Sequence, residues 1–299
     1  MAFPTGWAHK VAITIDHNDI DADLIDWSLV FDESFDSVLT QVNGPLDADG
    51  TRPSINGGGD IRFSTDAAGN NQLAVDIRDW TTNNTPGSAT CEVAVGTFAV
   101  SSSADTTIYM WWGKSGETQP GVSTTYGQYN AYDSDHVAVW PDGAGTDRTS
   151  GKGGTNVGSL SIGGRTGTVG TATEFNGTSQ YFELTDNAEY DLLDGFTFEA
   201  LLDLDDDDEF GPIFSCRGDG VGASTPLDYQ WTWVGVTGLS DEGKMRINWG
   251  GNSIQTSSSD TNVTSGWKHL AVSFDEATAR HYLGGSADGT DSNSSPMAA

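Results

Sequence analysis

Short apolar runs separated by turn clusters dominate the first 115 residues of the chain. Gly, Pro, Asn and Asp gather between the runs, as in NGGGD and NNTPGS, and supply turn geometry. The runs themselves are rich in the β-branched and aromatic residues that favour strands. They are VAITI (11–15), SLVF (28–31), IRFS (61–64), LAVDI (73–77), CEVAV (91–95) and TIYMWW (107–112). This spacing predicts six short strands in an antiparallel β-sandwich.

The rest of the chain shows the same strand-like pattern after a break. The segment 113–134 has no strand period and is expected to be a linker. An Asn-Gly pair in TEFNGTSQYFEL (173–184) predicts a hairpin, and FTFEALLDL (196–204) alternates with a period of two. Further strand-like runs are PIFSC (212–216), YQWTWVGV (229–236), MRINW (245–249) and WKHLAVSF (267–274). We therefore expect an all-β protein of two β-sandwich domains, residues 1–134 and 135–299.

Charge narrows the classes of partner. The 299 residues include 43 Asp and Glu against 13 Lys and Arg, for a net charge of −30. This excludes nucleic acid as a natural partner, because phosphate binding needs clustered cations. The dominance of Asp and the five lysines are typical of proteins in salty or marine settings, and simple solubility is the alternative.

The N-terminus predicts neither export nor anchoring. It has no basic and apolar stretch of the secretory kind, and no apolar run approaches the roughly 18 residues that span a membrane. Synthesis in a cytoplasm without membrane insertion is therefore expected.

Catalytic signatures are missing from the sequence. There is no Gly-x-Ser-x-Gly elbow or phosphate-binding loop, and the five His lack the i, i+4 spacing of a zinc helix. Cys91 and Cys216 show no CxxC spacing, which favours two buried apolar side chains over a disulfide or metal pair. These observations predict a protein that is not an enzyme.

The second half resembles the laminin-G-like, concanavalin-A-like jelly-roll family. The resemblance rests on TATEFNGTSQYFELTD, on FTFEALLDLDD followed by PIFSC, and most specifically on WKHLAVSFDEATARHYLGG. The first half is similar to a domain of unknown function that precedes such jelly rolls in viral and prokaryotic surface proteins. That similarity rests on GWAHKVAITID, DIRFSTDAAGNNQLAVDIRDW, ATCEVAV and TTIYMWWGK. The resemblance implies a jelly roll for the second domain.

The jelly-roll resemblance raises the questions of hydrolysis and of a metal. Glycosidases of this fold carry paired carboxylates, but the nearest string, Glu189-Tyr-Asp191-Leu-Leu-Asp194, ends in Asp and is expected to open a strand. Members often hold a structural Ca²⁺, for which acidic loops provide oxygen ligands. The candidate ligands are Asp142, Asp147, Asp205 and Asp207, with solvated loops as the alternative.

Tryptophans are the candidate ligand-binding residues. Trp231 and Trp233 lie two apart and share a face, while Trp111 and Trp112 are adjacent and are expected to point to opposite faces of a strand. The outward ring of the adjacent pair is a candidate sugar platform or, more in keeping with Trp at protein contacts, an interface anchor.

The resemblance to viral surface modules predicts a function. We expect a virion structural protein of a tailed phage or archaeal virus, as a tail fibre, tail tip or capsid decoration, with host-glycan binding as a further role. The alternative is an adhesive carbohydrate-binding module of an extracellular, cell-surface protein. Because the family continues beyond the last hairpin seen here, either the sandwich is trimmed or a neighbouring chain covers its exposed edge, and we expect cover by a neighbour. The expected partners are therefore other virion proteins, copies of this chain and a host surface glycan.

Overall fold

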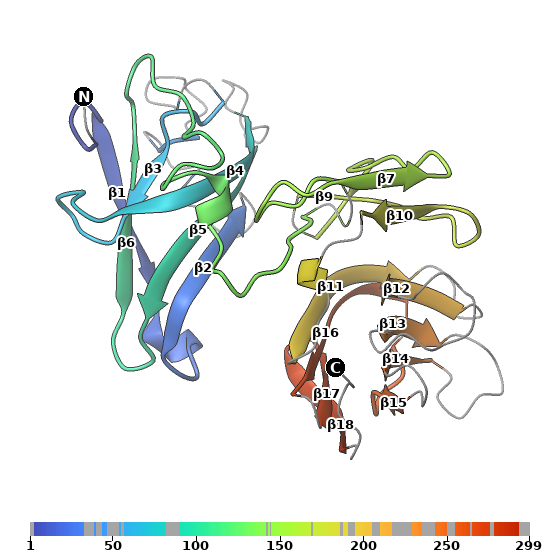
Figure 1. The fold of residues 1–299 in the computed structure, drawn as a ribbon. Helices are drawn as coiled ribbons and strands as arrows, with labels where there is room; N and C mark the ends of the chain where they lie inside the picture. Colours follow the sequence, from blue (N-terminus) through green and yellow to red (C-terminus); the bar gives the residue numbers. More distant parts are fainter. Residues whose placement is uncertain are drawn as a thin grey trace. The chain divides into compact units, whose positions relative to one another are not determined.

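A computed structural model describes residues 3–32, 39, 44–46, 54, 57–81, 90–141, 143, 145–168, 170–185, 188–190, 195–204, 210–216, 229–234, 243–249, 255–263, 265–275 and 278–292. Over these ranges the chain forms strands, turns and three short 3-10 helices (Figure 1). The expected all-β class is confirmed. No helix in the described ranges has the length and apolar character needed to cross a bilayer. The chain divides into two compact units, residues 1–156 with 161–174 and residues 157–160 with 175–299.

The first unit is built on one six-stranded antiparallel sheet with the strand order β1-β6-β3-β4-β5-β2. Its strands are β1 (His9–Ile15), β2 (Leu24–Asp32), β3 (Arg62–Ser64), β4 (Gln72–Thr81), β5 (Thr90–Val100) and β6 (Thr106–Trp112). Each of the six overlaps a run predicted from the sequence, and β2, β4 and β5 are about twice as long as their runs. The start of β4 pairs with β3 and the remainder pairs with β5, so the sheet curls at β4. Shorter elements of this unit are the 3-10 helices η1 (His17–Asp19) and η2 (Gln128–Asn130) and the strands β8 (Arg165–Thr166) and β9 (Thr171–Ala172). The strand β7 (Gly154–Val157) runs from the first unit into the second.

The curled sheet encloses an apolar core. Side chains on alternate strand positions point inward, and the most deeply buried come from several strands. They include Phe63 of β3, Val93 and Val95 of β5, and Ile108 and Met110 of β6, all at 0% exposure. The two halves of one sheet thus face each other across a core, as two sheets do in a sandwich.

The second unit contains two four-stranded antiparallel sheets. One has the order β11-β16-β17-β18, formed by β11 (Phe196–Leu204), β16 (Gly266–Phe274), β17 (Thr278–Leu283) and β18 (Ser286–Ser292). The other has the order β12-β13-β14-β15, formed by β12 (Phe210–Cys216), β13 (Tyr229–Val234), β14 (Lys244–Trp249) and β15 (Gln255–Ser258). The strand β10 (Tyr181–Leu184) and the 3-10 helix η3 (Ala188–Tyr190) precede them. Leu270 and Val272 of one sheet meet Trp231 and Ile247 of the other in a shared core, which makes the unit a sandwich.

The Asn-Gly pair at 176–177 does not close the hairpin expected from the sequence. The Asn176 side-chain oxygen accepts hydrogen bonds from three backbone N–H groups, those of Thr178, Ser179 and Gln180, at 3.1, 3.0 and 3.0 Å. This side-chain cap makes a wider turn than a two-residue hairpin. The strand before it, β9, pairs with β8 instead.

Segments expected to form a linker or to belong to the second domain pack against the first unit. In the expected linker, the Tyr126 carbonyl accepts a hydrogen bond from Val75 N at 3.2 Å. Beyond the expected boundary at residue 134, Val139 packs on a small cluster that includes Ala74, Ala94 and Tyr132. The first compact unit therefore also contains residues 135–156 and 161–174, which lie beyond the boundary expected from the sequence.

Replacing Ile108 by Ala should destabilise the first unit by about 2–5 kcal/mol, because a fully buried side chain is removed from a closed core. The free energy of unfolding in urea measures this effect. Ile25→Ala is the matched control, since Ile25 is 81% exposed and its removal should change stability by less than about 0.5 kcal/mol. Equal losses in the two variants would contradict this placement of the core.

Candidate functional site

The expectation that Trp111 or Trp112 points into solvent is wrong, because both are buried at 8% and 4% exposure. Trp112 belongs to the core of the curled sheet. On the other face, Trp111 Nε1 donates to Ser64 Oγ at 2.9 Å, and Lys10 Nζ lies 4.7 Å from the ring centroid. Phe3 packs edge-on against the same ring at 5.5 Å. Both faces of β6 are therefore covered, and neither ring is open to a sugar.

The other two candidate tryptophans lie on β13 of the second unit. Trp231 is 1% exposed and stacks on Phe198 with ring centroids 6.1 Å apart, so it is part of the core between the sheets. The Trp233 side chain lies outside the described residues.

The environment of Asp147 differs from that of a calcium ligand, the role for which it was a candidate. It is fully buried, and its two oxygens accept hydrogen bonds from the backbone N–H groups of Val139, Thr149 and Ser150 and from the hydroxyls of Thr149 and Ser150. A carboxylate has about four acceptor sites, so these donors already saturate it. Asp147 does not fit a calcium ion, and the other three candidates, Asp142, Asp205 and Asp207, lie outside the described residues.

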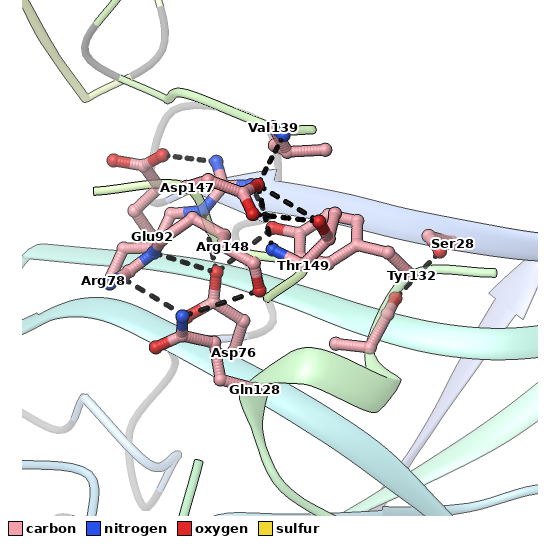
Figure 2. Close-up of polar contacts among 11 residues, drawn as sticks. Ser28, Asp76, Arg78, Glu92, Gln128, Tyr132, Val139, Asp147, Arg148 and Thr149 are labelled. Carbon is pink, nitrogen blue, oxygen red and sulfur yellow. Dashed lines mark hydrogen bonds and ion pairs between the residues drawn. The ribbon is translucent and has the colours of Figure 1, made fainter. Parts of the chain in front are cut away.

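Asp147 belongs to a segment that covers the outer side of β4 and β5, which we name the strap (residues 126–141 and 145–150). Figure 2 shows its polar contacts with the sheet. Asp76 of β4, 1% exposed, lies at the centre, where the Tyr132 hydroxyl donates to it at 2.9 Å. Arg148 forms an ion pair with Asp76 at 3.1 Å, and Arg78 forms another at 3.2 Å. Two strap residues thus converge on one buried carboxylate of the sheet.

The network continues from Arg78 along the sheet. Arg78 pairs with Glu92 of β5 at 2.6 Å and donates to the Tyr132 hydroxyl at 2.5 Å. Burial acts to lower the pKa of Arg78, but contacts with Tyr132, Glu92 and Asp76 outweigh it and raise that pKa. Burial, opposed by Arg78 and reinforced by Asp76, raises the pKa of Tyr132. The phenol therefore remains protonated and donates a hydrogen bond to Asp76. We name Asp76, Arg78, Glu92, Tyr132 and Arg148 the clasp, a structural cluster in which the cations are paired with carboxylates.

An exposed polar and apolar face lies on the outer side of β11 and β16 in the second unit. Leu270, Val272 and Phe274 of β16 point into the core, so the alternate residues Trp267 and His269 point outward. Leu201 of β11 lies opposite His269 in the register and is 44% exposed. Trp267 is half-buried and lies opposite Asp203.

Hydrogen-bonding groups flank these apolar side chains. His269 Nε2 lies 2.8 Å from Glu199 Oε1 on the neighbouring strand, and both side chains reach solvent. On the other side of His269, its carbonyl accepts from Gly284 N at 2.9 Å, and a Cβ added to Gly284 would meet no atom within 4 Å. The glycine turn therefore leaves open space beside His269. We name Glu199, Leu201, Trp267 and His269 the outer face.

A second exposed group, which the sequence analysis missed, lies in the first unit. Asp16 and His17, at the start of η1, meet Asp105 of the turn before β6, 88 residues further along. One ligand-type atom from each lies within 4.8 Å of the others, and no other trio of this kind occurs among the described residues. Spacing along the chain carried no signal for it, because the sheet brings these two turns together.

Of the carboxylates considered for hydrolysis, Glu189 is exposed in η3, and Asp191 and Asp194 lie outside the described residues. Cys91 is buried in the first core, and the Cys216 side chain is likewise outside the described residues.

Replacing Asp76 by Asn should release the strap, because Arg148 then loses its carboxylate partner and Arg78 keeps only Glu92. Breaking a buried pair in this way costs about 3–5 kcal/mol. The expected result is faster hydrogen exchange in residues 126–141 and 145–150. Asp79→Asn, on an exposed position of the same strand, is the control and should leave exchange unchanged. Unaltered protection in Asp76→Asn would argue against the clasp.

The strap should also loosen in acid. Although burial opposes it, the backbone and hydroxyl donors around Asp147 hold its pKa below the ordinary value. A pKa depressed by folding adds stability at pH values above the unfolded pKa of about 3.9, and this stability is lost as the pH falls through the folded pKa. Urea unfolding from pH 7 down to about pH 2 should show this loss in the wild type. Asp147→Asn should be less stable at pH 7 and flatter below about pH 4; parallel profiles would disprove the assignment.

Comparison with known families finds a match for the second unit. Residues 175–299 match the laminin G family described as the concanavalin A-like lectin/glucanases superfamily. No curated protein and no solved structure matched the chain. The family match begins after residue 174, so the resemblance expected for the first half has no counterpart in it. Residues 175–299 therefore form a concanavalin A-like lectin/glucanase domain, as the motifs in the second half of the sequence predicted.

Proposed function

We propose that this protein is a non-catalytic structural protein of a virus particle that binds a host carbohydrate through the outer face. The observation that carries the proposal is a concanavalin A-like domain whose sheet presents Leu201 and Trp267 beside the Glu199–His269 pair. Sugars have apolar ring faces and many hydroxyls, so they bind where apolar side chains adjoin hydrogen-bonding groups.

Spacing on this face favours binding over hydrolysis. The acidic residues Glu199 and Asp203 lie four positions apart on β11, which corresponds to about 13 Å at about 3.3 Å per residue. Glycosidases need two carboxylates separated by about 5–9.5 Å. Glu199 is also engaged with His269 across the strands. The pair therefore suits orientation of a bound sugar and not acid–base attack on it.

The charge of the chain narrows the ligand class. At −30, the protein repels sulfated or sialylated glycans at long range. Arg280, the cation on β17 of the same sheet, pairs with Asp275 at 2.6 Å and offers no unpaired positive charge. The ligand best suited to the outer face is a neutral oligosaccharide.

A virus particle supplies the setting in which such a shallow face is useful. Many copies on one particle convert weak single contacts into strong attachment. The same face would serve an adhesive module of a cell-surface protein, and the family match does not distinguish the two settings. Capsid and tail genes beside the coding sequence favour the first setting, and a secretion operon favours the second.

A glycan array that contains neutral and anionic oligosaccharides tests the proposal. We expect binding to neutral glycans, and about tenfold weaker binding for Leu201→Ser, equivalent to about 1.4 kcal/mol of lost contact. Ile162→Ser, which removes a 39% exposed aliphatic side chain elsewhere, is the matched control and should bind normally.

Three results would count against the proposal. A blank array would refute glycan binding, and equal binding by Leu201→Ser and the control would refute the outer face as its location. Release of sugars by the wild type, abolished in Glu199→Gln, would show that the domain is an enzyme.

A further inference from the structure

We infer that Asp16, His17 and Asp105 form a binding site for one divalent transition-metal ion such as Zn²⁺. The inference is independent of the proposed glycan binding, because the three residues lie in the first unit. It rests on the distances between their ligand atoms, on the chemistry of those atoms and on how the backbone holds them.

The distances between ligand atoms match those around a small cation. His17 Nδ1 lies 2.7 Å from Asp105 Oδ1 and 3.6 Å from Asp16 Oδ1. Zinc binds such atoms at about 2.0–2.2 Å, which places neighbouring ligands about 2.9 Å apart in octahedral and about 3.4 Å apart in tetrahedral geometry. The two observed distances lie just below and just above these values. An ion can therefore be accommodated by small side-chain rotations.

The donor set selects the kind of metal. One imidazole nitrogen with two carboxylates is a mixed nitrogen and oxygen set that suits Zn²⁺, Ni²⁺ or Mn²⁺. Ca²⁺ takes six to eight oxygen ligands and gains little from the imidazole. Three protein ligands at an exposed position also leave coordination sites open to water.

Local hydrogen bonds hold the carboxylates in place without blocking them. Asp16 caps η1, with Oδ1 accepting from Asn18 N at 2.8 Å. Asp105 Oδ1 accepts from His17 N at 3.2 Å, which fixes the second turn against the first. Each Oδ1 atom already accepts two hydrogen bonds, whereas Oδ2 accepts none from the described residues, so a rotation of each carboxylate presents Oδ2 to an ion near His17 Nδ1. The ligands are thus positioned by the backbone before any ion arrives.

The surrounding charge adds to the attraction. The turn at residues 16–23 carries four Asp and no Lys or Arg. Such a concentration of like charge at one end of the sheet raises the local concentration of cations. An ion bound there would join the turn at η1 to the turn between β5 and β6, a contact otherwise made by exposed polar pairs including Asp23 with Ser102 at 2.7 Å.

A second His–Asp pair provides a matched control. His136 Nδ1 lies 2.6 Å from Asp133 Oδ1, much like the His17–Asp105 contact, and is also exposed. It belongs to no trio of ligand atoms among the described residues. Variants at His136 therefore report what an ordinary His–Asp pair contributes to metal binding.

The test measures Zn²⁺ binding to the untagged chain by calorimetry and by competition with a chromophoric chelator. We expect one site per chain in the wild type and in His136→Gln. His17→Gln and Asp105→Asn should each bind at least about tenfold more weakly, since even indirect loss of a ligand's support costs that much. Excess Ca²⁺ should not displace the Zn²⁺.

Two further measurements keep the result decisive. In the wild type, Zn²⁺ should shift the imidazole ¹⁵N resonances of His17 and leave those of His136 unchanged, whatever the variants do to folding. It should also raise the melting temperature of the wild type and not that of His17→Gln. Absence of a wild-type site, or equal Zn²⁺ affinity in the His17 and His136 variants, would overturn the inference.

Discussion

The first unit depends on the buried carboxylate of Asp76. A charge at 1% exposure is tolerable only when cations and donors surround it, and β4 itself supplies only Arg78. Tyr132 and Arg148 come from 56 and 72 residues further along the chain to complete the shell. The strap must therefore lie across β4 and β5, where it also buries Ala74 and Ala94. This explains why four consecutive residues of β4, Leu73 to Asp76, are all buried although strand side chains alternate.

Most of the strands could be predicted because their signal is local. Runs such as CEVAV and FTFEALLDL carry the residue types and the period of two that a strand with one buried face requires, and they became β5 and β11. The second unit was also recognisable from its motifs, because the inward positions of β16 repeat Leu, Val and Phe within a distinctive Trp-x-His-Leu pattern. Gly-rich turns between strands could also be predicted, because their geometry depends on neighbouring residues in the chain and not on a distant segment.

The errors arose where a distant segment changed what a local pattern meant. Alternation correctly put Trp111 and Trp112 on opposite faces, but it could not show that Phe3 and Lys10 cover the outer one. An acidic residue in a turn such as Asp147 has the same local sequence whether water, a metal or five protein donors surround it. The meeting of His17 with Asp105 depends on the sheet order, which no periodicity reveals. Function at such positions is a property of the tertiary fold.

The scarcity of cations relative to acids bears on where the paired charges of the first unit lie. The chain has 13 Lys and Arg for 43 acids. In the described first unit, Arg78 and Arg148 pair with the buried carboxylates of Glu92 and Asp76. Arg62 and Lys114 pair with Glu117, which is partly exposed. Salt weakens attraction between exposed charges much more than between buried ones, so these pairs persist where surface repulsion is screened. The acids outnumber the cations by 30, so cationic partners are too few for the acids at the surface. That surface attracts a metal ion at Asp16, His17 and Asp105 and repels polyanions. The excess of acids therefore favours the binding of cations over the binding of anions.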